Sequence, residues 1–193
     1  KFGHENGNML WEIFNHTFDY MPLCGVIDKK IFCCHGGIPR SNISIHAINE
    51  IRCPLRDPKS QSRIADEIMW SDPCPSKQFN RLRGHQHQFL RRRSRCGISI
   101  DDDDSEFLFN EKRNAGYLFN ERALDRFLHE NGLTFLIRSH EYCPKGYKIN
   151  LNNKCLTVFS NMNYCNQRNK AAFAMVESCN CAPKVHILEL KGE

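Results

Sequence analysis

The sequence has 193 residues, of which 40% are hydrophobic and 25% charged, and it carries a formal net charge of +5. This length and composition are those of one globular domain and not of a disordered tail. No apolar run approaches the roughly 18 residues that a membrane-spanning helix needs, and so mild a positive charge does not by itself indicate nucleic acid.

Residues 1–72 are the first of two regions that read as ordered core, and they begin with a helical pattern. Asn8 can cap this helix and Pro22 ends it. Its apolar residues recur at helical spacing: Leu10, Ile13, Phe14 and Phe18. The chain has no apolar signal core and does not begin with Met, which argues against secretion and predicts a true start further upstream.

Two strand-like segments follow, CGVID and KKIFCC, and the Asp28-Lys29 turn between them predicts a β-hairpin. The second strand ends at His35. Gly36-Gly37 then allows a tight turn that side chains would obstruct. A histidine at the end of a rigid strand is a candidate metal ligand or catalytic group, and a hydrogen-bonded structural histidine is the alternative. Two short helices come next, ISIHAINEIRCP and SQSRIADEIMWSDP.

A charged zone over residues 74–111 places the basic block RLRGHQHQFLRRRSRCG before the acidic block DDDDSE. The stretch up to Asp104 lacks a periodic apolar face, so we expect a mobile surface insertion that leaves the core undisturbed. Docking to nucleic acid or to an acidic partner is the alternative, but the aromatic residues that stack on bases are sparse here. Ser94 and Ser105 are candidate kinase targets.

The second ordered region, residues 112–193, opens with NERALDRFLHENGL, an amphipathic helix stopped by Gly132. Five strand-like segments follow: TFLIRS, GYKI, CLTVFS, AFAMV and KVHILEL. This order of elements predicts an α+β fold in which hairpins dominate the sheet.

Polar groups again follow strands in this region. Arg138 and His140 end the strand FLI, and Tyr164 follows CLTVFS. Three strands thus deliver His or Tyr at a polar end, and His35 and His140 could share one divalent ion at a single sheet edge. Unrelated polar strand ends are the alternative.

The cysteines indicate the redox compartment of the protein. They number eleven, include the adjacent pair Cys33-Cys34, and show no C-x-x-C spacing. This pattern argues against a disulfide framework and against a zinc knuckle, to which Cys179-Asn180-Cys181 is the nearest approach. Others, such as Cys155 and Cys165, lie in apolar or strand-like runs. Reduced thiols predict an intracellular protein, cytoplasmic or nuclear.

Four motifs in order carry a resemblance: KIFCCHGGIPRS, IMWSDP, FLIRSHEYCPKGY and LTVFSNMNYCNQRNKAAF. Together they resemble the C-terminal half of the catalytic domain of metal-dependent serine/threonine phosphoprotein phosphatases, the calcineurin-like family. The motif sequences are most similar to those of the tetratricopeptide- and EF-hand-containing members. The resemblance runs from Leu10 to Leu190 and implies part of a metallophosphoesterase α/β sandwich, with a mostly antiparallel sheet and flanking helices. In the family, a shorter segment joins the positions of Asp72 and Arg113.

The resemblance also implies residue roles. His35 and His140 match two ligands of one of the family's two metal ions, which are Mn or Fe with Zn. Arg113 and Tyr164 match residues that bind the substrate phosphate, and Asp72 matches a carboxylate beside them.

The implied activity is metal-dependent hydrolysis of phosphoserine and phosphothreonine on proteins, with phosphoproteins and regulatory subunits or domains as partners. The family's GDxHG, GDxxDRG and GNHE motifs are not in the chain. The chain alone is therefore expected to bind at most one metal ion, weakly, and to be inactive. The alternatives are a non-catalytic scaffold or phosphoprotein-binding module and, from the basic block, a nucleic-acid module.

Overall fold

The computed structural model describes residues 2–40, 44–93, 105–177 and 184–190. Its strands form three sheets. The largest sheet has the order β1-β2-β6-β8-β7, with β1 Cys24–Ile27, β2 Ile31–Cys34, β6 Phe135–Arg138, β8 Cys155–Val158 and β7 Tyr147–Asn150. A second sheet has the order β3-β5-β4, with β3 Asp72–Pro73, β5 Tyr117–Phe119 and β4 Phe107–Phe109. The third pairs β9 Ala171–Glu177 with β10 Lys184–Leu190.

The predicted first hairpin is confirmed. β1 and β2 pair antiparallel, with Cys24 opposite Cys34. Asp28 and Lys29 have φ of 48° and 54°, and the Lys30 amide donates to the Ile27 carbonyl at 2.9 Å. A two-residue turn with positive φ at both positions matches the twist of the strands that it joins.

The predicted later strands all form, and their pairing is mixed. β1–β2, β7–β8, β4–β5 and β9–β10 pair antiparallel, as a hairpin-rich sheet requires. The centre of the largest sheet differs, because β2–β6 and β6–β8 are parallel pairs. Parallel pairing needs a long crossover and burial of the strands. Both conditions hold, since about a hundred residues separate β2 from β6 and their Phe32 and Leu136 are fully buried.

The helices are α1 His4–Phe18, α2 Ile45–Asn49, α3 Pro58–Gln61, α4 Arg63–Trp70, α5 Ser76–Arg93 and α6 Glu121–Glu130. Side-chain caps start three of those expected from sequence: Ser44 accepts from the Ala47 amide, Ser62 from the Ala65 amide and Asn120 from the Ala123 amide. α6 packs its apolar face on the largest sheet, where Phe127 meets Phe32 edge-on at 5.1 Å between ring centroids. The predicted stop, Gly132, has a φ of 66°.

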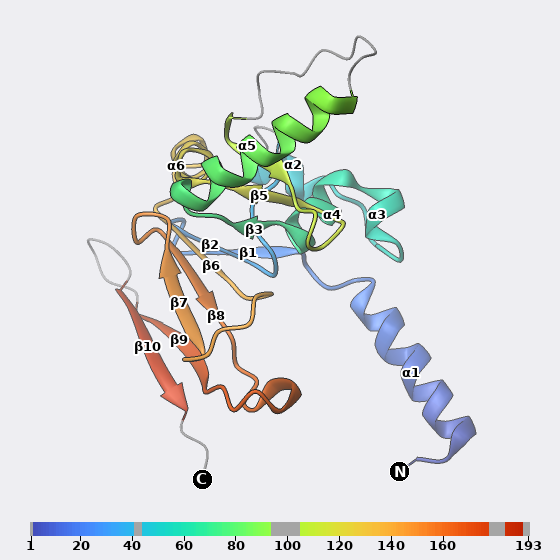
Figure 1. The fold of residues 1–193 in the computed structure, drawn as a ribbon. Helices are drawn as coiled ribbons and strands as arrows, with labels where there is room; N and C mark the ends of the chain where they lie inside the picture. Colours follow the sequence, from blue (N-terminus) through green and yellow to red (C-terminus); the bar gives the residue numbers. More distant parts are fainter. Residues whose placement is uncertain (1, 41–43, 94–104, 178–183, 191–193) are drawn as a thin grey trace.

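The N-terminal helix differs from the prediction in its start and in its surroundings. α1 begins at His4 with Gly3 as N-cap, so Asn8 lies inside the helix and does not cap it. No α1 residue is buried, and Figure 1 shows the helix projecting away from the rest of the chain. The predicted helix therefore forms, but its apolar face is not buried against the described part of the chain. Among the described helices, none is long and apolar enough to cross a membrane.

The charged zone contains a helix where the sequence predicts a loop. α5 runs over Ser76–Arg93 and lies across the β3-β5-β4 sheet in Figure 1. Phe79 is fully buried and clusters with Cys74 and Leu108. The sequence pattern missed this anchor because one buried aromatic near the helix start makes no periodic face. The mobility of the zone stays a prediction, and Ser94 and Asp101 to Asp104 lie outside the described residues.

Candidate active site

The two histidines predicted at strand ends meet. His35 follows β2 and His140 follows β6, and these strands are parallel neighbours with Cys33 opposite Ile137. The carboxyl ends of parallel neighbours lie at one sheet edge. The Ser139 amide donates to the His35 carbonyl at 3.0 Å, which holds the two loops together. His35 Nε2 lies 3.0 Å from His140 Nδ1.

The glycines beside His35 allow its loop to pack closely against the end of α4. The amides of Gly36 and Gly37 both donate to the Ile68 carbonyl at 3.0 Å, at the C-terminal end of α4. A Cβ on Gly36 would lie 2.7 Å from that carbonyl oxygen and collide with the Met69 carbonyl. The predicted need for glycine is thus a close approach of two backbones.

His140 has an unusual conformation and environment. Its φ is 62°, in the left-handed region, and such residues concentrate at functional sites. The Trp70 ring meets its imidazole edge-on at 5.3 Å. Burial, with Arg113 and Arg138 nearby, lowers the pKa of His140 to about 4, and burial also lowers the pKa of His35. Both rings are therefore neutral at pH 7, the form that binds metal ions.

Arg138, which the sequence places two residues before His140, is buried structural support. Its side chain is 0% exposed. Its guanidinium donates to Asp72 Oδ1 at 2.6 Å, to Glu141 at 3.1 Å and to the Ser71 carbonyl at 3.3 Å. It also donates to the Gly36 carbonyl. All three of its nitrogens are thus engaged within the protein.

Asp72 is the carboxylate that ties the site together. Oδ1 accepts from Arg138, and Oδ2 accepts from Arg113 Nε at 3.0 Å and from Asn110 at 2.9 Å. Burial by itself would raise the pKa of Asp72, but Arg138, Arg113 and Asn110 outweigh it and hold this pKa below its ordinary value. Asp72 is ionised and orients both arginines.

The Arg113 side chain is held in place by hydrogen bonds but remains partly exposed to solvent. Besides its bond to Asp72, its Nη2 donates to the His140 carbonyl at 3.1 Å. Its side chain is 23% exposed, and Nη1 makes no hydrogen bond with any described residue. Arg113 therefore stands beside the histidine pair with donor capacity to spare.

Tyr164 stands apart from this cluster in its contacts. It begins a short 3-10 helix, Tyr164–Asn166, and its ring packs edge-on against Phe159 at 5.3 Å. Asn169 shapes the loop by accepting from the Tyr164 amide at 2.8 Å and donating to the Asn161 carbonyl at 2.7 Å. Within the described chain, Tyr164 makes no hydrogen bond or ring contact with the two histidines, Asp72 or Arg113.

Sequence reasoning missed three participants. Asn110 and Glu141 position Asp72 and Arg138, and Trp70 packs on His140. Trp70 and Glu141 stand inside the quoted motifs IMWSDP and FLIRSHEYCPKGY, which could have signalled them. Asn110 had no such signal, because it lies in the charged zone.

The residues present fit half of a metal site. His140 Nε2 is buried and has no hydrogen-bond partner among the described residues, although a buried ring nitrogen ordinarily has one. Two adjacent neutral imidazoles suit a transition metal ion. In the part of the chain that the structure describes, no group of three His, Cys, Asp or Glu side chains could hold an ion.

Comparison with known proteins decides the family. The model of the calcineurin-like phosphoesterases matches residues 1–144. The chain belongs to this family. The resemblance read from the four sequence motifs is therefore confirmed.

Several relatives of this phosphoesterase chain are serine/threonine phosphatases by name. A protein phosphatase 2A catalytic subunit of Dictyostelium discoideum is 30% identical over 86% of this chain and 43% of the relative. The PP2A-like phosphatase PPG1 of Candida albicans is 34% identical over 81% of this chain and 30% of its own length. Human serine/threonine-protein phosphatase 5 is 29% identical over 92% of this chain and 30% of its own length. The chain thus spans less than half of each of these relatives.

A solved structure confirms the fold. It is a Saccharomyces cerevisiae protein serine/threonine phosphatase with similarity to human phosphatase PP5. It superposes with a TM-score of 0.64 and 21% identity over 96% of this phosphoesterase chain and 52% of the yeast chain. The predicted fold class, a metallophosphoesterase architecture of sheets with flanking helices, is therefore confirmed.

Proposed function

We propose that this chain supplies the C-terminal half of an active site that hydrolyses phosphoserine and phosphothreonine on proteins. The observation that carries the proposal is the histidine pair, 3.0 Å apart, with Arg113 bonded to the carbonyl of His140. The names of the relatives support the choice of substrate, since all three are protein phosphatases and two are named serine/threonine phosphatases.

His35 and His140 are the residues that would hold a metal ion, manganese or one of an iron and zinc pair. Divalent ions supply polarisation of the phosphoryl group and activation of a water at neutral pH. Two imidazoles fill only part of the coordination shell of a metal ion. This chain by itself should therefore bind at most one ion, and bind it weakly. The other ligands would come from the part of the phosphatase domain that precedes this chain in its relatives.

The chain's own residues bind and orient the phosphate. Asp72 and the His140 carbonyl fix the plane of the Arg113 guanidinium, and Nη1 remains to donate to a phosphate oxygen. A planar guanidinium matches two phosphate oxygens at once. Arg138 keeps Asp72 and Gly36 in position and does not itself reach the phosphate. Tyr164 would line the phosphate pocket from the loop that Asn169 shapes.

The proposed partners are phosphoprotein substrates and regulatory subunits or domains. The proposed compartment is the cytoplasm or nucleus. The eight described cysteines are free, and free thiols are typical of a reducing compartment.

Expression of the chain alone and of the chain extended upstream tests the function. Phosphoserine peptide turnover is measured with added manganese. The chain alone should show none, and the extended protein should be active. His35→Ala should abolish that activity, and His46→Ala, at an exposed helix residue, should not.

Two other outcomes have clear meanings. Turnover by the chain alone, abolished by His35→Ala, would mean that unrecognised ligands complete the site. An extended protein that binds phosphopeptide but never turns it over would favour the alternative of a phosphoprotein-binding scaffold.

A further inference from the structure

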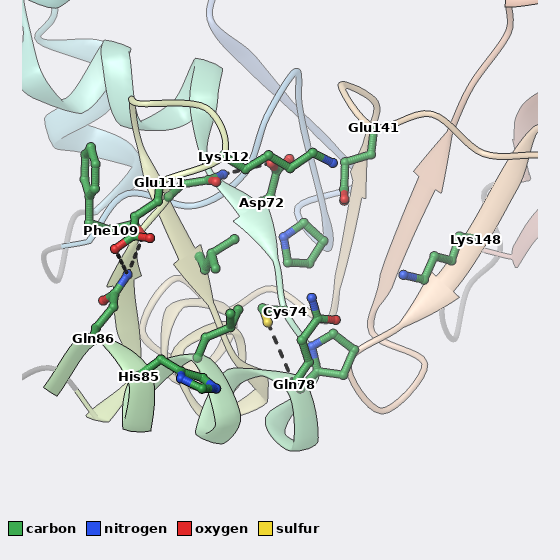
Figure 2. A pocket seen from close by; sticks show the side chains of 15 residues that line it. Asp72, Cys74, Gln78, His85, Gln86, Phe109, Glu111, Lys112, Glu141 and Lys148 are labelled. Atoms are coloured by element: carbon green, nitrogen blue, oxygen red, sulfur yellow. Dashed lines mark hydrogen bonds between the residues drawn. The ribbon is translucent and has the colours of Figure 1, made fainter. Parts of the chain in front are cut away.

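A pocket of about 680 Å³ lies beside the candidate active site. In Figure 2, the α5 side chains His85 and Gln86 stand on one side of it, and Asp72 and Lys112 stand on the other. Lys148 reaches toward it from β7. Its volume is within the range of about 300–1,000 Å³ that ligand pockets occupy, which is more than one amino-acid side chain fills.

The pocket shares Asp72 with the candidate active site, although Arg113 and the two histidines are not in its lining. Asp72 and Asn110 line it, and Asp72 accepts hydrogen bonds from both Asn110 and Arg113. Glu141 lines the pocket and pairs with Arg138. A chain bound with its phosphate at Arg113 would therefore have the pocket directly next to the phosphorylated residue.

The wall formed by α5 is anchored. Phe79 is fully buried against Cys74 and Leu108, which attaches the first turns of the helix to the β3-β5-β4 sheet. Further along α5, Gln86 donates to the Phe109 carbonyl at 3.2 Å and to Glu111 at 3.3 Å. The pocket is therefore formed in advance, which lowers the entropic cost of binding.

The lining combines apolar surface with two lysine side chains and three carboxylates. Leu82, Leu118 and Pro73 supply apolar surface. Two of the three carboxylates pair with arginines, Asp72 with Arg113 and Arg138 and Glu141 with Arg138, and Glu111 accepts from the uncharged amide of Gln86. Neither Lys112 nor Lys148 forms a salt bridge with any described residue. A ligand with one apolar group and one negative charge would complement this lining.

We propose that this pocket binds the polypeptide segment next to the phosphorylated residue and selects phosphoproteins with a large apolar residue beside an acidic one. The apolar side chain packs against Leu82 and Leu118, and the carboxylate faces Lys112 and Lys148. The proposal rests on the proposed phosphatase function for the position of the phosphate. The helix α5, which forms one wall of the pocket, lies in the charged zone, residues 74–111. This zone makes the segment between Asp72 and Arg113 longer than in the family.

Peptides that share one phosphoserine and differ only in the adjacent pair test this selection in the extended protein. The pairs are Leu-Glu, Ala-Glu, Leu-Lys and Ala-Lys, each placed before or after the phosphoserine. Anisotropy of labelled peptides gives affinity, and kcat/KM gives turnover. The Leu-Glu peptide should exceed Ala-Lys by about tenfold or more in both, as apolar pockets discriminate by roughly 10- to 200-fold. Equal values for all four pairs would overturn the proposal.

Variants locate the selection. Lys148→Glu should lower the ratio of Glu to Lys peptides by about fivefold, the scale of an exposed ion pair. Gln78→Trp, on the exposed side of α5 and in the lining, should fill the pocket and remove the preference for Leu over Ala. Lys59→Glu, on α3 and outside the lining, is the matched control and should change neither ratio. Unchanged ratios in both pocket variants would place the selection elsewhere.

The two proposals fail separately. Turnover of p-nitrophenyl phosphate, which has no peptide flanks, reports the phosphatase function alone. Its absence with a retained Leu-Glu preference in binding would overturn the function and keep the pocket. Turnover of p-nitrophenyl phosphate without any preference for flanking residues would keep the phosphatase function and overturn the pocket proposal.

Discussion

Two arginines contact Asp72, and their surroundings predict different consequences of the same substitution. Arg138→Lys replaces a buried guanidinium that serves four acceptors. Lysine keeps the charge, but three ammonium donors on one nitrogen cannot serve all four acceptors, so we expect the free energy of unfolding to fall by about 1–3 kcal/mol, the cost of a buried acceptor left without a hydrogen bond. Arg113→Lys, partly exposed, should cost under about 1 kcal/mol but remove most activity of the extended protein, because an ammonium cannot replace a planar fork on phosphate.

Thermal unfolding and kcat/KM measured on both arginine variants separate the two effects. Loss of activity with an unchanged Tm is expected only for Arg113→Lys. Equal losses of activity, with stability intact in both, would mean that the two roles are wrongly assigned.

Cysteine reactivity should follow burial. Burial raises the pKa of Cys155 to about 12 and that of Cys74 to about 11, so at pH 8 their reactive thiolate fractions are very small. Cys53 and Cys165 are exposed. Cys165 lies in the 3-10 helix Tyr164–Asn166, which corrects the expectation that it lies in an apolar or strand-like run. Iodoacetamide at pH 8, followed by peptide mass spectrometry, should label Cys53 and Cys165 first. Cys155 and Cys74 should react only after denaturation in urea, and early labelling of Cys155 would contradict its burial.

At the scale of elements, the His35 loop depends on how closely β2 approaches α4. Gly36→Ala would force a Cβ into the backbone of Ile68 and Met69. It should destabilise the chain by at least about 1–3 kcal/mol, as overpacked sites do. Gly84→Ala is the matched control, since no atom lies within 4 Å of its Cβ position on α5, and there alanine should stabilise by roughly 0.5–1 kcal/mol. Urea unfolding of both variants gives the comparison, and a neutral Gly36→Ala would show that the two backbones can separate.

At the scale of the whole molecule, α1 exposes a large apolar face. Five of its side chains are more than half exposed: Met9 at 55%, Trp11 at 67%, Ile13 at 54%, Phe14 at 58% and Phe18 at 58%. Soluble monomers rarely expose so large a patch. We therefore expect the chain expressed alone to associate at micromolar concentration.

Size-exclusion chromatography with light scattering tests the association. Phe14→Gln should shift the chain toward monomer, and Glu12→Gln, a polar position on the same helix, should not. A monomer at high concentration in the unmodified chain would falsify the prediction.

The sequence by itself determined the parts of this protein that depend on neighbours along the chain. Helical spacing and the Asp28-Lys29 turn act within a few residues, so most helices and strands were predicted near their observed bounds. The two strand-end histidines were also found in this way. The motif order gave the family, which the comparisons confirm.

Only the tertiary structure decided which of these parts meet. The parallel pairing of β2 with β6 brings His35 and His140 to one edge from opposite halves of the chain. It also buries Arg138 between Gly36 and Asp72. The regular apolar face of α1 is exposed in the described chain, which its sequence pattern alone did not show. Such contacts join segments that are far apart in the sequence. They depend on which buried faces and strand edges fit one another, and a pattern of a few neighbouring residues does not contain that information. For the same reason, Phe79 could anchor a helix in a zone whose composition predicts a loop.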